Sequence, residues 1–200
     1  MKNRILFFAF FLSSIALFGQ KQETLFGKSR VVGGFGGPFV EYNFANDDTQ
    51  VSVGGGGAVI IGDFFLGGYG MGSTDQAWIN DIDPFKLDLG HGGFWIGATY
   101  PSHKLIHFFS SAKIGWGAVN ITFYDDNVQV EDRIFVLEPE AGLEVNVFKW
   151  FRIGFTGSYR WVDGINPDIS GVGRDYYNGF GANLTFRFGG FGNNWNDWND

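Results

Sequence analysis

Hydrophobic and polar residues alternate along most of this chain with a period of two. The pattern is clearest in residues 151–161 and returns in residues 179–188, where apolar side chains alternate with small, polar or charged ones. Successive side chains of a β-strand point to opposite faces, so each segment has one apolar and one polar face. The apolar positions of the first segment are Phe151, Ile153, Phe155, Tyr159 and Trp161.

Read in the same way, the whole chain predicts eight strands and no amphipathic helix of useful length. The turn residues between the alternating segments set the boundaries. Each segment is long enough for the roughly 9–11 residues that a tilted membrane strand needs. The predicted strands are Ser29–Phe44, Gln50–Ile61, Phe64–Gly72, His91–Tyr100, His107–Phe123, Ile134–Phe148, Phe151–Trp161 and Tyr177–Phe188.

The connections between these strands are predicted to alternate between short and long. The short set is Gly62-Asp63, residues 101–106 and Lys149-Trp150, and the longer, polar set is residues 45–49, 73–90, 124–133 and 162–176. Tight periplasmic turns and long external loops are typical of a transmembrane barrel. An even number of strands also places both chain termini on the periplasmic side.

Composition and charge narrow the class of protein further. The chain has 32 glycines and 19% aromatic residues, both high against ordinary usage. It has no cysteine, and this absence excludes a disulfide framework and a thiolate metal site. The net charge of -7 disfavours nucleic acid as a partner. Lys2, Arg4 and the apolar run that follows resemble a secretory signal, too short to span a bilayer comfortably. We expect a signal peptide at 1–20, a periplasmic segment at 21–28, a barrel at 29–188 and a polar tail at 189–200.

The architecture resembles the small eight-stranded outer-membrane β-barrels of Gram-negative bacteria, which have the OmpA-type transmembrane architecture. The last strand is similar to the C-terminal signal read by the barrel-assembly machinery, through Gly181, Leu184 and Phe186. Two features of this strand differ from that signal. Gly179 stands where the signal usually has a polar residue, and the chain continues past Phe188, whereas such barrels often end at an aromatic residue. The resemblance implies an all-β, antiparallel, up-and-down transmembrane barrel in the outer membrane. It also implies lipids and the assembly machinery as partners, while any partner of the external loops stays open.

If the apolar face points outward, acidic and basic residues must share the interior. The alternation points three acids and four bases inward, from the last four strands. Unpaired buried charges are costly, so we expect these groups to form an ion cluster. An eight-stranded barrel has room only for its own side chains, which predicts a filled interior with no diffusion pore. The predicted cluster is Lys113, Glu138, Glu140, Glu144, Arg152, Arg160 and Arg187.

Two prolines conflict with this interpretation. Pro38 and Pro139 fall within predicted strands, and proline has no N–H to donate to a ladder. A closed barrel has no edge strand to hide the missing donor, so we expect either β-bulges or broken strands at these positions.

Aromatic residues gather toward the ends of the predicted strands, as in the girdles at the two membrane interfaces. Those predicted near the periplasmic interface are Trp150, Phe186 and Phe188, and those near the external interface are Trp116, Tyr159 and Trp161.

Catalysis is a weaker hypothesis. His107 and Ser110 are the candidate pair, because small outer-membrane lipid A deacylases use a His/Ser/acid arrangement, although the spacing here differs from theirs. The leading interpretation is therefore a structural or surface-interaction barrel, with no cofactor and no metal. One alternative is a hydrolase of lipid A or other envelope lipids. Another is a soluble, lipocalin-like barrel that binds a hydrophobic ligand and exposes Arg152 and Arg187 to water.

Overall fold

The computed structural model describes residues 31–45, 48–79, 83–123, 129–166 and 176–192. Within these ranges, eight antiparallel strands close into a barrel in chain order, with the last strand paired to the first. No helix among these residues is long and apolar enough to cross a membrane. The strands are β1 (Val31–Ala45), β2 (Asp48–Ile61), β3 (Phe64–Ile79), β4 (Asp83–Tyr100), β5 (Ile106–Phe123), β6 (Gln129–Phe148), β7 (Phe151–Asp163) and β8 (Gly179–Phe191).

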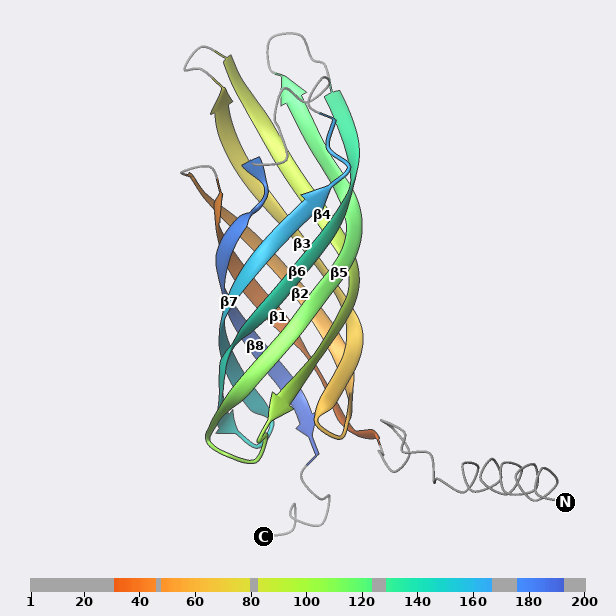
Figure 1. Cartoon of the computed structure of the whole chain (residues 1–200), viewed down its shortest axis with the longest axis vertical. Coiled ribbons are helices and arrows are strands. Elements are labelled where there is room, and N and C mark those ends of the chain that lie inside the picture. The colour runs from red at the N-terminus through yellow and green to blue at the C-terminus, as the bar shows by residue number, and fades with distance from the viewer. Residues whose placement is uncertain (1–30, 46–47, 80–82, 124–128, 167–175, 193–200) are drawn as a thin grey trace, which may run out of the picture.

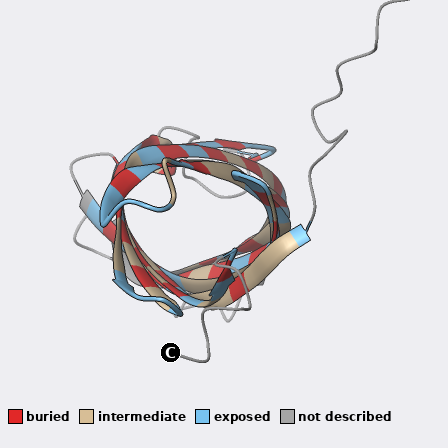
Figure 2. Cartoon of the chain, turned by 90° about the horizontal axis from the view of Figure 1, so that it is seen from below, coloured by how far each residue is buried: buried red, intermediate tan, exposed pale blue. Residues whose placement is uncertain are grey.

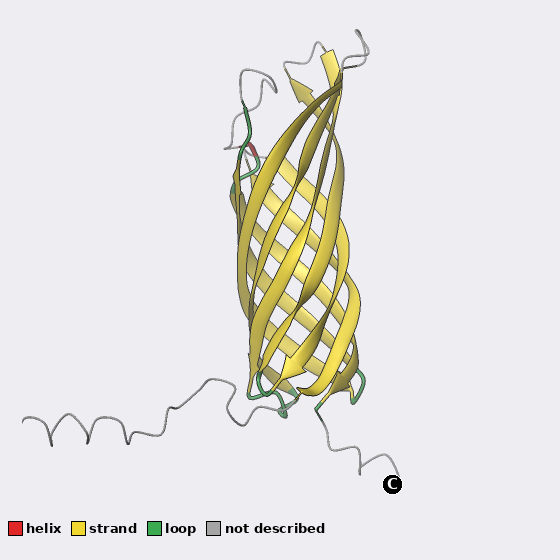
Figure 3. Cartoon of the chain, turned by 90° about the vertical axis from the view of Figure 1, so that its right-hand side faces the viewer, coloured by secondary structure: helices red, strands yellow, loops and turns green. Residues whose placement is uncertain are grey.

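The barrel is a tall, tilted meander. Each strand pairs with the next through a hairpin, so closure needs only the β1–β8 ladder, from Gly33↔Phe191 to Phe44↔Phe180. Figure 3 shows that nearly all of the described chain is strand. The described chain begins and ends at the same end of the barrel, drawn at the bottom of Figure 1 and called the lower end below. This arrangement of the two ends follows from the even number of strands.

Burial alternates along the strands, as the sequence pattern predicts. In β7 every second residue from Arg152 is buried, and the residues between them are exposed or half-buried. Phe155 is 58% exposed and Phe180 72%, whereas Arg160 is 0% and Arg187 2% exposed. Viewed from below, buried and exposed residues form alternating bands around the ring (Figure 2). The lipocalin-like alternative is therefore wrong, because Arg152 and Arg187 are buried inside a barrel whose outer surface is apolar.

The interior also contains two apolar clusters. An upper apolar cluster lies around Val136, Val162 and Tyr177, near the connection between β7 and β8. A lower aromatic cluster combines residues of β1 to β5 with Phe191 of β8, and Trp95 packs edge-on against Phe35 and Phe65 at centroid distances of 5.4 and 5.5 Å. The interior is thus filled by rings as well as by ions.

Glycine on β2 makes room for this aromatic packing. A Cβ added at Gly56 would lie 3.0 Å from Cε3 of Trp95 and 2.7 Å from the Gly68 carbonyl oxygen. A side chain at this position would therefore displace the indole. The glycine-rich run Gly54–Gly57 is part of the strand, and Gly56 is the member of the run that lies against Trp95.

The prediction of a long loop at residues 73–90 is wrong. β3 and β4 continue through most of it as an antiparallel ladder that ends at Ile79↔Asp83. β6 likewise begins at Gln129, inside the predicted connection 124–133. These extensions were missed because the prediction required an apolar face, whereas a ladder beyond the apolar belt needs only backbone hydrogen bonds. Figure 1 shows the β3–β4 and β5–β6 hairpins rising above the β1–β2 hairpin.

Neither proline breaks its strand, and neither sits at a bulge. Pro38 pairs with Gly55 of β2, and Pro139 pairs with Ala112 of β5. On the other side of each proline the ladder skips a few residues and resumes in the same register. The expectation of a bulge or a break is therefore wrong, because a short one-sided gap in the ladder is enough to accommodate the missing N–H.

Candidate functional site

The candidate site is a column of buried ions inside the wall formed by β5 to β8. The structure places all seven predicted cluster residues in the interior, each no more than 6% exposed. At its centre, Lys113 on β5 lies with its Nζ 2.7 Å from Glu138 and 3.6 Å from Glu140. The two glutamates are two residues apart on β6, so both point inward and share one ammonium group.

Glu140 is the most extensively hydrogen-bonded carboxylate of the column. Thr156 on β7 and Asn183 on β8 donate hydrogen bonds of 2.9 and 3.0 Å to its Oε2. The Ser111 hydroxyl donates to Oε1, and Ser111 in turn accepts a 2.9 Å hydrogen bond from the indole of Trp95. Glu140 therefore joins β5, β6, β7 and β8, and connects the ions to the lower aromatic cluster.

Glu144 forms the lower end of the column, where several cationic or polar groups converge on it. His107 Nε2 lies 2.7 Å from Oε1, Arg152 donates a 3.1 Å hydrogen bond to the same oxygen, and Arg187 pairs with Oε2. The guanidinium of Arg187 lies 4.5 Å from the ring centroid of Phe35, a cation–π distance. The guanidinium of Arg152 lies 3.9 Å from the ring centroid of Phe191. Both arginines therefore contact a carboxylate on one side and an aromatic ring on the other.

The sequence interpretation missed one member of the cluster, Glu41 on β1. Its side chain is fully buried and accepts a hydrogen bond from Nη2 of Arg160, which also donates to Ser52 at 3.2 Å. Adding Glu41 to Glu138, Glu140 and Glu144 gives four acids against Lys113 and the three arginines, so these charges balance. The signal was present, because Glu41 alternates with outward Val40 and Tyr42.

The candidate catalytic pair does not assemble. His107 is buried in the lumen and bound to Glu144, whereas Ser110 lies on the outer face of β5. Residues three apart on a strand point to opposite faces, so the imidazole cannot serve this hydroxyl as a base. Of the other histidines, His91 is buried with its Nδ1 3.0 Å from the Tyr69 hydroxyl, and His103 is exposed in a turn.

The geometry of the column suits a structural role better than a chemical one. Its charges are matched, buried and mostly hydrogen-bonded to partners on other strands. Among the described residues, no cluster of three His, Asp or Glu side chains is arranged to hold a metal ion.

Outside the strands, burial raises the pKa of the Tyr177 hydroxyl above its ordinary value and keeps that group neutral.

The predicted interface aromatics lie on the outer surface in two groups. Near the lower turn, Trp150 stacks on Phe148 and Phe188 at 5.5 and 6.1 Å, and Phe186 stacks on Phe151 at 6.4 Å. Further up the wall, Phe135 lies between Trp116 and Trp161, at 5.7 and 6.4 Å. Tyr159 makes an edge contact with Phe180 at 5.1 Å.

Comparison with known proteins supports the fold and nothing finer. No protein-family model and no curated protein matches the chain. Among solved structures, Neisserial surface protein A has a TM-score of 0.52 at 9% identity, covering 80% of this chain and 97% of its own. The N-terminal β-barrel domain of Pseudomonas aeruginosa OprF has a TM-score of 0.50 at 15% identity, covering 81% and 99%. The chain has the fold of small eight-stranded outer-membrane barrels.

Proposed function

We propose that this protein is an integral outer-membrane β-barrel with a structural or surface-interaction role and no open pore. The observation that carries the proposal is the inverted distribution of side chains. Large apolar residues such as Phe94, Phe155 and Phe180 are more than half exposed on the outside, while the ions are buried within. Such an outer surface is stable in lipid, because hydrocarbon solvates it and the closed ladder leaves no backbone edge.

The filled interior supports the absence of a pore. Trp95, Phe39 and Phe109 occupy the lumen from one side, and Arg160 and Arg187 from the other, all less than 3% exposed. The cation–π contacts of Arg187 with Phe35 and Phe109, at 4.5 and 4.6 Å, join the two sides across the axis. An ion that crossed this interior would have to separate charge pairs in a low-dielectric environment, which is costly.

The hairpins at the two ends of the barrel are the parts that can contact partners outside the membrane, and they support a surface role. Below the apolar belt the described strands are joined by tight turns, such as Gly62-Asp63 and Lys149-Trp150. At the other end, β3–β4 and β5–β6 rise beyond the rest of the rim (Figure 1). In the proposed orientation these taller hairpins face the outside of the cell, and a partner would meet them first.

Two measurements on the full chain test this proposal. The protein should be recovered in outer-membrane fractions and should migrate differently on gels before and after heating, as folded barrels do. Reconstituted in planar bilayers, it should give no stable conductance steps. Recovery in the soluble periplasmic fraction would exclude the membrane assignment, and steady single-channel conductance would exclude the closed interior.

A further inference from the structure

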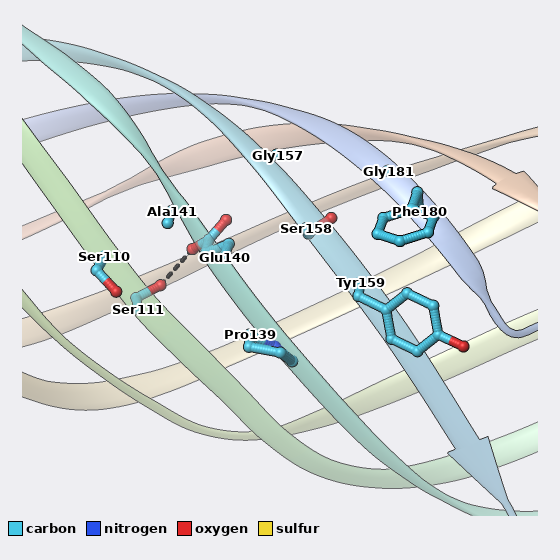
Figure 4. Close-up of a pocket in the computed structure, with 10 residues that line it drawn as sticks. All are labelled: Ser110, Ser111, Pro139, Glu140, Ala141, Gly157, Ser158, Tyr159, Phe180 and Gly181. Atoms are coloured by element: carbon cyan, nitrogen blue, oxygen red, sulfur yellow. Dashed lines mark hydrogen bonds between the residues drawn. The ribbon is translucent and has the colours of Figure 1, made fainter.

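The outer wall of the barrel has an open depression of about 490 Å³ across β5, β6, β7 and β8, called the wall cavity below. Figure 4 shows its lining residues, with the rings of Tyr159 and Phe180 beside each other on β7 and β8. The outward residues that line it between these rings and β5 are small or compact: Ser110, Pro139, Ala141 and Gly157.

Two features of the sequence create this cavity. Ser110, Ala141, Gly157 and Ala182 are paired in register, so four small residues form one row across the outer face of four strands. Beside this row, the β6–β7 ladder has no pairs between Leu137↔Trp161 and Glu140↔Ser158, where Pro139 lacks an N–H. The wall is therefore both thin and incompletely bonded at one place.

Glu140 is the one charged residue among those that line the cavity. Its carboxylate oxygens are engaged inside the barrel by Ser111, Thr156 and Asn183. The rim is aromatic, with Phe180 72% exposed and Tyr159 40% exposed. The cavity therefore suits an apolar occupant.

The level of the cavity narrows the identity of that occupant. Ala141 lies roughly 18 Å above Phe148 along the barrel axis, at about 3.3 Å per residue and a strand tilt of about 40°. The apolar belt of such a barrel is about 25 Å tall. Phe148 belongs to the lower aromatic group, which marks the lower edge of the belt. Ala141 therefore lies in the outer-facing half of the belt. Lipid headgroups lie outside the belt, and only acyl chains reach this depth.

We propose that this wall cavity binds one acyl chain of a lipid from the outer-facing leaflet. A second copy of the barrel is a poorer fit, because the protruding rings of Tyr159 and Phe180 hold a convex wall away from the small residues. An acyl chain is thin and flexible enough to lie along the row and to fill the gap beside Pro139. The inference rests on the proposed membrane location and adds a specific lipid contact to it.

The test is photo-cross-linking of the full-length protein in vesicles that contain a phospholipid with a diazirine in the middle of one acyl chain. Labelled peptides are mapped by mass spectrometry. The test variant is Gly157→Leu, because a Cβ there meets only the Gly181 carbonyl oxygen, at 3.9 Å, and the barrel should tolerate it. The matched control is Gly70→Leu on β3, an outward glycine of the opposite wall with nothing within 4 Å of an added Cβ. Heat-modifiable migration verifies that both variants fold.

Labelling of the wild-type protein should concentrate on the β6 and β7 peptides around Ala141 and Gly157, several-fold above the other belt peptides. Gly157→Leu should reduce this labelling to the belt average, and Gly70→Leu should leave it unchanged. Uniform labelling around the belt, unaffected by Gly157→Leu, would refute the acyl-chain site and leave the membrane location intact. No labelling of any belt peptide would refute the proposed function itself. Loss of the signal only when a second barrel copy is diluted out would assign the cavity to barrel–barrel contact instead.

Discussion

Arg160 on β7 donates a hydrogen bond to Glu41 on β1, across the intervening strand β8 and 119 residues away in the sequence. Both side chains are 0% exposed, and Arg160 also approaches Glu138 at 3.9 Å. This contact ties the first strand to the seventh inside the barrel. It therefore reinforces the place where the chain closes on itself.

The first prediction concerns this closing pair. Glu41→Ala leaves the Arg160 guanidinium buried without its main partner and should lower the free energy of unfolding by about 3–5 kcal/mol. Urea titration of the barrel in lipid vesicles measures the loss. Glu131→Ala, an exposed acid on β6, is the control and should change stability by less than about 1 kcal/mol. An equal, small effect for both variants would show that Glu41 is not a closing contact.

A second prediction separates charge from hydrogen bonding at the lower end of the column. Glu144→Gln keeps the shape and an acceptor oxygen but leaves Arg152 and Arg187 without their shared anion. We expect it to destabilise the barrel by several kcal/mol, since two buried cations lose their compensation. Arg187→Met in the same chain removes one of those cations and should recover part of the loss. The temperature at which the heat-modifiable band converts is a direct readout, and failure of the second substitution to recover anything would count against the pairing.

A third prediction tests the packing of the glycine wall. Gly56→Val would drive its side chain into the indole of Trp95, at an added-Cβ distance of 3.0 Å from Cε3. Overpacking of this kind costs about 1–3 kcal/mol and should lower the folding yield into vesicles. Gly70→Val on the outer face meets nothing within 4 Å and should fold as wild type. Equal yields for the two variants would place Gly56 outside the packed interior.

The lower aromatic group gives a fourth prediction. Trp150→Ala removes the ring that stacks on Phe148 and Phe188 and should reduce stability in bilayers by about 1–3 kcal/mol. Trp150→Phe retains a ring for stacking and should recover most of that loss. If the alanine variant is as stable as wild type in vesicles, the group has no anchoring role at the interface.

The number of strands, the face to which each side chain points and most of the ion cluster could be predicted from the sequence. Each of them follows from the alternation of apolar and polar residues. Inward Glu138 and outward Phe155 are both fixed by that period once one face is assigned. The ends of the strands were less accessible. Residues 73–79 carry no clear apolar alternation, and their pairing with β4 depends on backbone bonds that leave no pattern in the side chains.

Contacts between strands that are not neighbours in the barrel were the least predictable. Glu41 could be assigned to the interior from its alternation with Tyr42, but nothing local shows that Arg160 would reach it over β8. Pro38 and Pro139 illustrate the opposite error. The missing N–H of proline favoured a bulge or a break. In the structure, the hydrogen-bonded pairing of Pro38 with β2 and of Pro139 with β5 keeps both strands in register.

The central claim is that the apolar face of each strand meets lipid and the polar face meets the interior. The chain contains no cysteine, so single cysteines can be introduced along β7 and labelled with a nitroxide without background. In vesicles, labels at Ile153 and Phe155 should collide freely with lipid-soluble oxygen and be shielded from a water-soluble nickel complex. A label at Ser158 should be immobilised by the packed interior. Relaxation of the Ile153 and Phe155 labels by the nickel complex would mean that water surrounds this face, and would contradict the account.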